Sequence, residues 1–214
     1  MIDGTLETIR NAKLLAIVRA DRQDWAQQVV DTLADAGVKA IEVSLTTPGA
    51  VEVIQSLASR PRRTYVVGAG TVLTSEQTSA VAAAGAQFIV TPGLSESIEA
   101  AASLGLPSLV GVLTPSEAIE AMRRGASMLK LFPADVGGPA LLKALRAPLP
   151  SYEFVPVGGV SVAAVGDFLS AGAVALGVGS ALTGSGHEPP DLGWVSAQAA
   201  AYQSAISAWV REPA

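Results

Sequence analysis

The chain has 214 residues, of which half are hydrophobic and 15% are charged, so it has the composition of a globular protein with a large core. The net charge of −5 argues against nucleic acid and anionic membrane surfaces as partners. Because the chain has no cysteine and a single histidine, disulfides, thiolate catalysis and Cys- or His-rich metal sites are excluded.

Eight short apolar runs alternate with helical patterns along the chain. The predicted strands are residues 14–18, 40–45, 65–68, 88–91, 108–111, 128–132, 154–157 and 174–177. Glycines that end the helical patterns precede several of these strands, as expected of left-handed helix caps: Gly37, Gly85, Gly105, Gly125 and Gly172. Their spacings of 48, 20, 20 and 47 residues indicate that each long interval contains two βα units. The pattern predicts parallel βαβ units.

Polar residues mark the expected starts of the helices. Asp21 precedes a helix predicted over residues 23–36, and Thr47-Pro48 opens the next, since proline suits the first helical turn. Thr74 and Thr114 have the character of N-caps, because acidic residues follow each of them in the first turn.

Together these elements predict an α/β fold, a single-domain (β/α)8 TIM barrel over residues 1–214. An N-terminal helix precedes it. A final helix, with Val195, Tyr202, Ile206 and Trp209 near one face, closes the barrel or packs on a neighbouring subunit. The competing architecture, an open doubly wound sheet, usually has fewer strands. It also carries a glycine-rich turn after its first strand, where this chain has Arg19-Ala-Asp-Arg-Gln.

From the sequence we expect neither a secretory signal nor a membrane-spanning segment. Asp3 and Glu7 stand before the first apolar run, which is unlike a secretory signal. The longest weakly polar run, residues 171–182, contains three glycines and is too short to span a membrane. We therefore expect a cytoplasmic protein with no membrane partner.

Three charged residues interrupt otherwise apolar strands near their C-terminal ends, where barrel enzymes carry their reactive groups: Arg19, Glu42 and Lys130. Successive side chains of a strand alternate between its two faces. In strand 40–45 the apolar residues share one face, so Glu42, Ser44 and Thr46 point into the barrel. The same alternation turns Lys130 inward. The direction of Arg19, which shares a face with two apolar residues, is left open by the sequence.

Lys130 is the candidate nucleophile. An amine attacks a carbonyl only when it is neutral, and burial or a nearby cation such as Arg19 lowers its pKa. The iminium that forms is an electron sink for carbon–carbon cleavage. The alternative interpretation is a structural ion pair between Lys130 and Glu42.

Glu42 is the candidate general acid and base. A carboxyl group inside an apolar barrel has a raised pKa, which suits proton transfer near neutral pH. The alternatives are the ion pair with Lys130 and a buried, protonated carboxyl with no role in catalysis.

Two late glycine turns are typical of a phosphate site. Gly158-Gly159 follows strand 154–157, and Gly177-Val-Gly179-Ser180 follows the last strand. Loops after the seventh and eighth strands commonly bind phosphate in this fold, because backbone N–H groups can approach the anion where glycine leaves room. The alternative is that these glycines serve only barrel packing and helix caps.

Other residues have weaker signals. Thr71 could bond a substrate carboxylate or cap a helix, and Phe132 could wall the substrate or belong to the core. His187, in a Gly/Pro-rich loop, is expected on the surface. The three tryptophans lie on helical patterns and are expected to be packing residues.

In combination, these motifs resemble the class I 2-keto-3-deoxy-6-phosphogluconate (KDPG) and 2-keto-3-deoxy-6-phosphogalactonate (KDPGal) aldolase family. They occur in the family's order over residues 14 to 182 and are Ala16-Ile-Val-Arg19, Ile41-Glu-Val-Ser-Leu45, Gly68-Ala-Gly-Thr-Val-Leu73, Phe88-Ile-Val-Thr-Pro-Gly93, Leu129-Lys-Leu-Phe-Pro-Ala134, Val157-Gly-Gly-Val160 and Gly177-Val-Gly-Ser180.

The resemblance implies a retro-aldol reaction on a small 2-keto acid that releases pyruvate, with Lys130 as the Schiff base and Glu42 as the proton carrier. Further implied substrate contacts are Arg19 and Thr71 at the carboxylate, Pro92 and Phe132 around pyruvate, and Gly158, Gly159, Gly179 and Ser180 at the 6-phosphate. It also implies a homotrimer that uses no metal and no cofactor.

One position departs from the gluconate-type members of the family. Some of these carry a substrate-binding arginine where this chain has Thr46, and other members have a small polar residue there. Thr46 therefore becomes a candidate substrate contact, and the preferred sugar-acid epimer is left open. A related alternative is cleavage of 4-hydroxy-2-oxoglutarate to pyruvate and glyoxylate.

Two rival classes use the same residues differently. In a phosphosugar isomerase or synthase, Glu42 would be the base and Lys130 an electrostatic group. A non-catalytic barrel would bind sugar phosphates and leave them unchanged.

Overall fold

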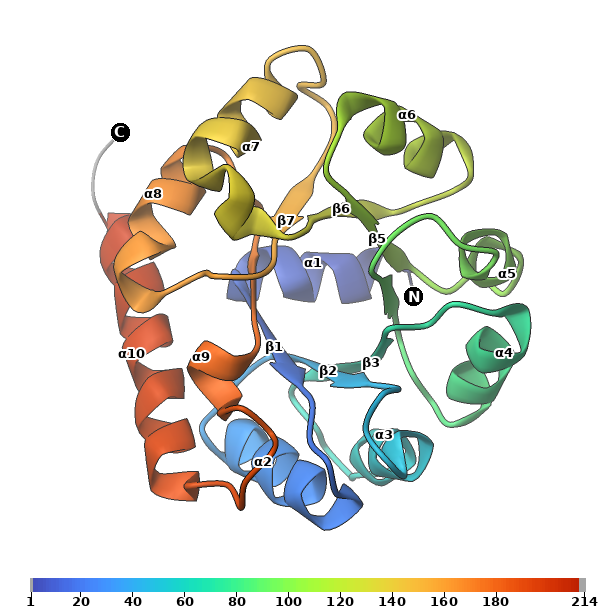
Figure 1. Ribbon diagram of the computed structural model, residues 1–214. Helices are drawn as coiled ribbons and strands as arrows, with labels where there is room; N and C mark the ends of the chain where they lie inside the picture. The colour runs from blue at the N-terminus through green and yellow to red at the C-terminus, as the bar shows by residue number, and fades with distance from the viewer. Residues whose placement is uncertain (1, 212–214) are drawn as a thin grey trace.

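The computed structural model describes residues 2–211 and confirms the predicted barrel. Eight parallel strands follow one another in the order β7-β6-β5-β4-β3-β2-β1-β8, and a bridge between Val157 and Gly177 joins the two ends of the sheet (Figure 1). The strands are β1 (Leu14–Val18), β2 (Ala40–Ser44), β3 (Val66–Gly70), β4 (Ile89–Thr91), β5 (Ser108–Val112), β6 (Met128–Leu131), β7 (Phe154–Pro156) and β8 (Leu176–Val178). Strand β8 begins at Leu176, two residues later than the start predicted for the last strand.

Helices surround this barrel on the outside. They are α2 (Gln23–Asp35), α3 (Ala50–Ala58), α4 (Ser75–Ala83), α5 (Ser97–Ser103), α6 (Pro115–Arg123), α7 (Gly138–Arg146) and α8 (Val165–Ser170), with single 3-10 turns at Ala134–Val136 and Val162–Ala164. Thr74 and Thr114 cap α4 and α6 as predicted, each in a capping box with the residue three positions on. The five cap glycines all have positive φ.

The predicted start of the third helix was wrong. It begins at Ala50 rather than at Thr47-Pro48, because Gly49 is left-handed (φ 68°) and interrupts the helical backbone. The Thr47 hydroxyl does not cap the helix. It accepts a hydrogen bond from the Ala20 backbone N–H at 3.1 Å, which ties the end of β1 to the end of β2.

The strands separate two apolar cores, as their period-2 alternation predicted. In β2, Ile41 and Val43 face the outer core beneath the helices, and in β6, Leu129 and Leu131 do the same. The residues between them face the barrel interior. The inner core consists of Leu6, Ile9, Leu15, Ile17, Ala40, Val66, Phe88, Val90, Leu109, Met128, Val155, Val157 and Ala175.

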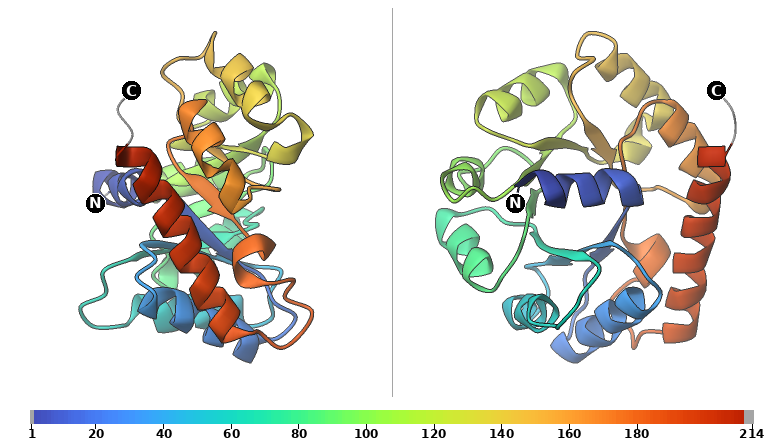
Figure 2. Two further views of the ribbon diagram at one scale, coloured as in Figure 1. Left: turned by 90° about the vertical axis from the view of Figure 1, so that its left-hand side faces the viewer. Right: turned by 180° about the vertical axis from the view of Figure 1, so that it is seen from behind.

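Helix α1 (Ile2–Ala12) lies across the end of the barrel at which the strands begin (Figure 2). Its Leu6 and Ile9 side chains belong to the inner core, and the helix contacts β1, β2 and β3. The helix therefore closes this end of the barrel with apolar side chains, and polar chemistry is confined to the opposite end.

Helix α10 (Leu192–Arg211) runs along the outside of α2 and α8 (Figure 1). Val195, Tyr202 and Ile206 are buried in the outer core, and the Tyr202 hydroxyl donates a hydrogen bond of 2.8 Å to the Val160 carbonyl. This helix was predicted either to close the barrel or to pack on a neighbouring subunit. In the described residues it packs on its own barrel. No helix within residues 2–211 is long and apolar enough to cross a membrane.

Candidate active site

A cavity of about 360 Å³ opens at the end of the barrel where the strands finish. Nearly all of the predicted site residues line it: Arg19, Glu42, Thr71, Pro92, Lys130, Phe132, Gly158, Gly159, Gly179 and Ser180. The β-strands bring these residues together although they are spread over most of the sequence, because the C-terminal ends of all eight strands meet at one rim.

Lys130 points into this cavity from β6. Only 8% of its surface is exposed, and its ammonium lies 4.6 Å from the centre of the Phe132 ring. Burial lowers the pKa of Lys130 below its usual value. The nearby Glu42 carboxylate opposes that shift, and Arg19 adds to it. Phe132, 37% exposed at the rim, is a wall of the cavity rather than a core residue.

Glu42 faces Lys130 from β2 and is 2% exposed. Its Oε2 is buried without a hydrogen-bond partner, and among the described residues no ion pair within 4.0 Å joins Glu42 to Lys130. Burial raises the pKa of Glu42, against the opposing effects of Lys130 and Arg19. The alternative of a structural ion pair is therefore not what the structure contains, and the carboxyl group is available to accept and donate protons.

Gly70 leaves the space that Glu42 occupies. A Cβ on Gly70, the last residue of β3, would lie 1.7 Å from Glu42 Oε1. The missing side chain on one strand therefore determines where the carboxylate on the neighbouring strand can lie.

Thr71 follows Gly70 with φ of +58°, a left-handed backbone that β-branched residues rarely adopt. Its Oγ1 lies 3.0 Å from Ser44 Oγ, which in turn lies 2.9 Å from Thr46 Oγ1. Since Thr74 caps the following helix, the alternative role of Thr71 as an N-cap is wrong. Thr71 lines the cavity near Glu42 and Pro92.

Thr46 is the one predicted contact that lies outside the lining of the cavity. It is exposed beyond the end of β2, and its hydroxyl contacts Ser44, which in turn contacts the cavity-lining Thr71. Alternation had placed it on the inner face. The extended backbone ends at Ser44, where the Thr47 N–H turns back to the Ser44 carbonyl, so the alternation no longer applies.

The two glycine turns form a further part of the cavity wall. Gly158 and Gly159 have φ of +97° and +70°, and Gly179 and Ser180 begin the short helix α9 (Ser180–Thr183). A Cβ on Gly159 would lie 2.5 Å from Asp135 Cβ, so a larger residue cannot be accommodated without a shift. These turns present backbone and one hydroxyl, a surface suited to an anion.

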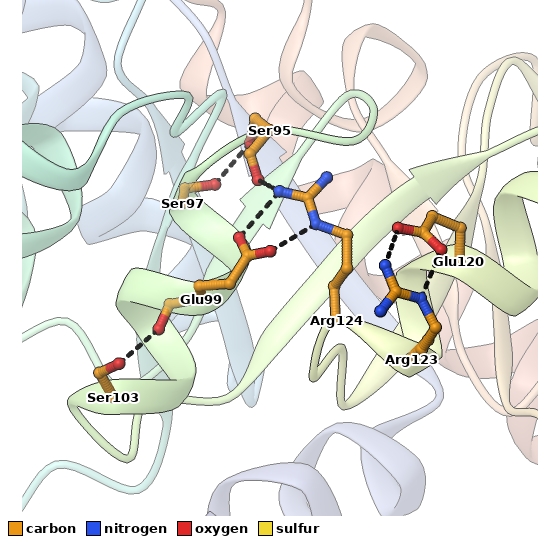
Figure 3. A network of polar contacts seen from close by, with 7 residues as sticks. All are labelled: Ser95, Ser97, Glu99, Ser103, Glu120, Arg123 and Arg124. Carbon is orange, nitrogen blue, oxygen red and sulfur yellow. Dashed lines mark hydrogen bonds and ion pairs between the residues drawn. The ribbon is translucent and has the colours of Figure 1, made fainter.

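Pro92 is carried by the loop between β4 and α5, which a polar network anchors from outside (Figure 3). Arg124 forms two hydrogen bonds with Glu99, with Nε 2.6 Å and Nη2 2.8 Å from its carboxylate oxygens, and donates another of 2.8 Å to the Ser95 carbonyl. Ser95 contacts Ser97, 2.7 Å away. Figure 3 shows that the neighbouring Arg123 pairs instead with Glu120.

The same loop is connected to the residues beside Thr71. The Ser97 hydroxyl donates to the Val72 carbonyl at 2.9 Å, and the Thr91 hydroxyl donates to the Gly93 carbonyl at 2.8 Å. The loop therefore braces two walls of the cavity, those formed by Pro92 and Thr71.

Sequence reasoning missed the part of the rim formed by Thr183, Gly184 and Ser185, which also line the cavity. From sequence, Gly184 and Ser185 were only the start of a Gly/Pro-rich loop, and Thr183 carried no signal. The available signal was their place shortly after the glycine turn that follows the last strand, since Thr183 ends the short helix that begins at Ser180. Within residues 2–211, no group of three or more His, Cys, Asp or Glu side chains is arranged to hold a metal ion.

His187 is exposed, as predicted, and its Nδ1 lies 2.9 Å from Asp21 Oδ2. Trp25 and Trp209 pack on the outer core as expected. Trp194 does not, because it is 39% exposed and lines a smaller side cavity of about 180 Å³ beside Arg19.

Comparisons with known proteins agree with the geometry of the cavity. The sequence of residues 5–196 matches the family model for KDPG and KHG aldolases. A probable 2-dehydro-3-deoxy-6-phosphogalactonate aldolase of Rhizobium meliloti is 38% identical over 84% of this chain and 85% of its own. A 2-dehydro-3-deoxy-phosphogluconate aldolase of Pseudomonas aeruginosa is 40% identical over 75% of this chain and 74% of its own.

A solved structure is similar over nearly the whole chain. The KDPG aldolase of Legionella pneumophila, with pyruvate captured as a covalent carbinolamine, has a TM-score of 0.76 and 27% identity over 94% of this chain and 95% of its own.

Proposed function

The chain belongs to the KDPG and KHG aldolase family, and on that premise we propose that it is a class I aldolase, a carbon–carbon lyase. It cleaves 2-keto-3-deoxy-6-phosphogluconate, or its galactonate epimer, to pyruvate and D-glyceraldehyde 3-phosphate. The observation that carries the proposal is the buried Lys130 amine, with its lowered pKa, in one cavity with a buried Glu42 carboxyl whose Oε2 has no hydrogen-bond partner. The covalent pyruvate of the similar Legionella enzyme supports the Schiff base.

The first stage joins substrate to enzyme. The neutral Lys130 amine attacks the C2 carbonyl, and the carbinolamine loses water to give a protonated imine. Glu42 supplies the proton that the departing hydroxide needs, a task for which its raised pKa is suited.

The second stage breaks the C3–C4 bond. Glu42 takes the proton of the C4 hydroxyl, and the bonding electrons move toward the imine nitrogen, which yields an enamine and free aldehyde. Glu42 then returns its proton to C3, and water hydrolyses the resulting pyruvate imine to release pyruvate and the Lys130 amine. The burial that lowers the pKa of Lys130 favours this return to the neutral amine.

The cavity walls would hold the two ends of the substrate. At the carboxylate end stand Arg19 and Thr71, with Pro92 and Phe132 around the pyruvate methyl group. The glycine turns at Gly158, Gly159, Gly179 and Ser180 would take the 6-phosphate through backbone N–H groups and one hydroxyl. Binding at both ends holds C2 against Lys130.

Borohydride reduction in the presence of pyruvate tests the Schiff base. We expect a permanent adduct on Lys130 by peptide mass spectrometry and none on Lys143, an exposed lysine of α7. Lys130→Arg is expected to lose nearly all turnover, whereas Lys143→Arg retains it. No adduct, or measurable turnover in Lys130→Arg, would instead favour the isomerase or synthase class.

A substrate panel tests the choice of substrate. The glycine turns support a phosphorylated acid, so both 6-phosphorylated epimers are expected to react faster than their unphosphorylated forms and than 4-hydroxy-2-oxoglutarate. A faster reaction of 4-hydroxy-2-oxoglutarate would contradict the phosphate site. It would favour the alternative activity, cleavage of that acid to pyruvate and glyoxylate.

We also propose a homotrimer in the cytoplasm. The trimer is supported by the family resemblance, and light scattering should give a mass about three times that of one chain. A monomer in solution would contradict it.

A further inference from the structure

Ser44 lies two residues beyond Glu42 on β2, and its side chain is completely buried beside the cavity-lining Thr71. Its Oγ lies between two other hydroxyls, 3.0 Å from Thr71 Oγ1 and 2.9 Å from Thr46 Oγ1. The Thr46 backbone N–H also points at Ser44 Oγ, at 3.4 Å. The three hydroxyls form a chain from the solvent-exposed Thr46 to the cavity-lining Thr71.

Thr71 is held at both sides by backbone hydrogen bonds. The Gly70 carbonyl accepts from the Leu45 N–H at 2.8 Å, and the Val72 N–H donates to the Val90 carbonyl at 3.1 Å. Between these anchors Thr71 keeps its left-handed backbone. Within residues 2–211 its hydroxyl is hydrogen-bonded to Ser44 alone, so Ser44 is the group that determines how this hydroxyl is oriented.

Counting protons gives the direction of donation along the three hydroxyls. Each hydroxyl has one proton to donate and two lone pairs to accept with. If Thr46 donates to Ser44 and Ser44 donates to Thr71, the Thr71 proton is free to donate into the cavity. In the opposite direction, Thr71 offers only lone pairs. A carboxylate accepts hydrogen bonds and donates none, so its binding selects the first direction.

We propose that Ser44 is a positioning residue, which aligns the Thr71 hydroxyl as a hydrogen-bond donor to the carboxylate of the 2-keto acid. The inference rests on the proposed function, and it assigns Ser44 no contact with the substrate itself. Donation along a hydroxyl chain strengthens its last bond, so the hydroxyl of Ser44 matters to the carboxylate end of the substrate and not to its phosphate end.

The test measures the pyruvate concentration that gives half-maximal borohydride trapping on Lys130. Ser44→Ala is expected to raise this concentration about tenfold, because an unaligned hydroxyl loses much of a bond to a charged group. Inhibition of the full reaction by inorganic phosphate, which reports on the far end, is expected to stay within about twofold. Ser44→Thr retains the hydroxyl and should restore pyruvate binding.

Ser108→Ala is the matched control. Ser108 is also a buried strand serine, but its hydroxyl has no hydrogen-bond partner and it does not line the cavity. The variant should therefore behave as the wild type. If the alanine variant does not fold, Ser44→Cys replaces it. Cysteine is close to serine in size but has only a weak donor, so this variant should show the shift in pyruvate concentration that is expected for Ser44→Ala.

Thr71→Val provides a second readout. If Ser44 acts through Thr71, adding Ser44→Ala to Thr71→Val raises the half-maximal pyruvate concentration no further. Full additivity of the two changes would overturn the inference.

Two other results would overturn the role of Ser44. One is normal trapping in the wild type with an unchanged half-maximal pyruvate concentration in Ser44→Ala. The other is an equal weakening of pyruvate binding and phosphate inhibition in that variant. Absence of trapping in the wild type would overturn the proposed function, and the role of Ser44 with it.

Discussion

Gly70→Ala should slow the proton transfers made by Glu42 while leaving the equilibrium amount of the Lys130 imine unchanged. The added Cβ would lie 1.7 Å from Glu42 Oε1, half of the 3.4 Å at which ordinary contact begins, and 2.5 Å from Glu42 Cδ. Because Gly70 has no positive φ, alanine fits the backbone of β3. The Glu42 side chain must therefore retreat, and Lys130 on β6 has no such contact to relieve.

The magnitude follows from the size of that retreat. Displacing the carboxylate by more than 1 Å from a productive position costs on the order of 100-fold in rate, or about 2.7 kcal/mol in the activation barrier. We therefore expect kcat of the cleavage reaction to fall about 100-fold or more. Trapping of pyruvate on Lys130 after long incubation should stay within about twofold of the wild type.

The assay pairs steady-state cleavage with borohydride trapping, on variants whose folding has been checked by circular dichroism. Gly4→Ala is the control, since nothing lies within 4 Å of a Cβ built on Gly4 in the remote helix α1. A Gly70→Ala protein with kcat within about threefold of the wild type would refute the claim that the position of Glu42 limits catalysis.

Two further changes test the electrostatics and the outer network. Glu42→Gln removes the charge that raises the pKa of Lys130, and Arg19→Ala removes one that lowers it, so the pH midpoint of pyruvate trapping should move down in the first variant and up in the second. Shifts in the same direction would contradict this account of the site. Arg124→Ala should lower the free energy of unfolding by about 1 kcal/mol and raise KM several-fold, because it releases the Ser95 carbonyl at the Pro92 loop. Arg123→Ala breaks only the exposed ion pair with Glu120, so its free energy of unfolding, measured like that of Arg124→Ala by urea titration, should stay close to that of the wild type. Equal effects of the two substitutions would exclude a role for this network.

The site residues that could be predicted from the sequence are those on strands, where the alternation of side chains between the two faces determines which residues point inward. Lys130 and Glu42 lie on the inner face because every second residue of a strand does, and their apolar neighbours showed which face was covered by helices. For Arg19 the sequence left the direction open. Its strand neighbours Leu15 and Ile17 belong to the inner core, and Arg19 lines the cavity just beyond them.

The remaining parts depend on backbone geometry beyond the strand ends, or on contacts between distant segments. Thr46 leaves the cavity because the chain turns after Ser44, and alternation holds only while the backbone is extended. The left-handed Thr71 and its contact with Ser44 join residues 27 positions apart. No local pattern specifies such a contact, and none shows that Gly70 makes room for a carboxylate on the neighbouring strand.

Helix α1 has a consequence for the order in which products leave. With Leu6 and Ile9 closing one end of the barrel, substrate and products share the mouth at the other end. In the proposed reaction the aldehyde is free after cleavage while pyruvate is still bound to Lys130 as the imine, so the aldehyde leaves by that route first and pyruvate last. In the reverse direction pyruvate must therefore enter first. In the proposed reaction, the single mouth and the covalent bond between pyruvate and Lys130 together make the enzyme ordered, with pyruvate as the product that reacts with the empty protein.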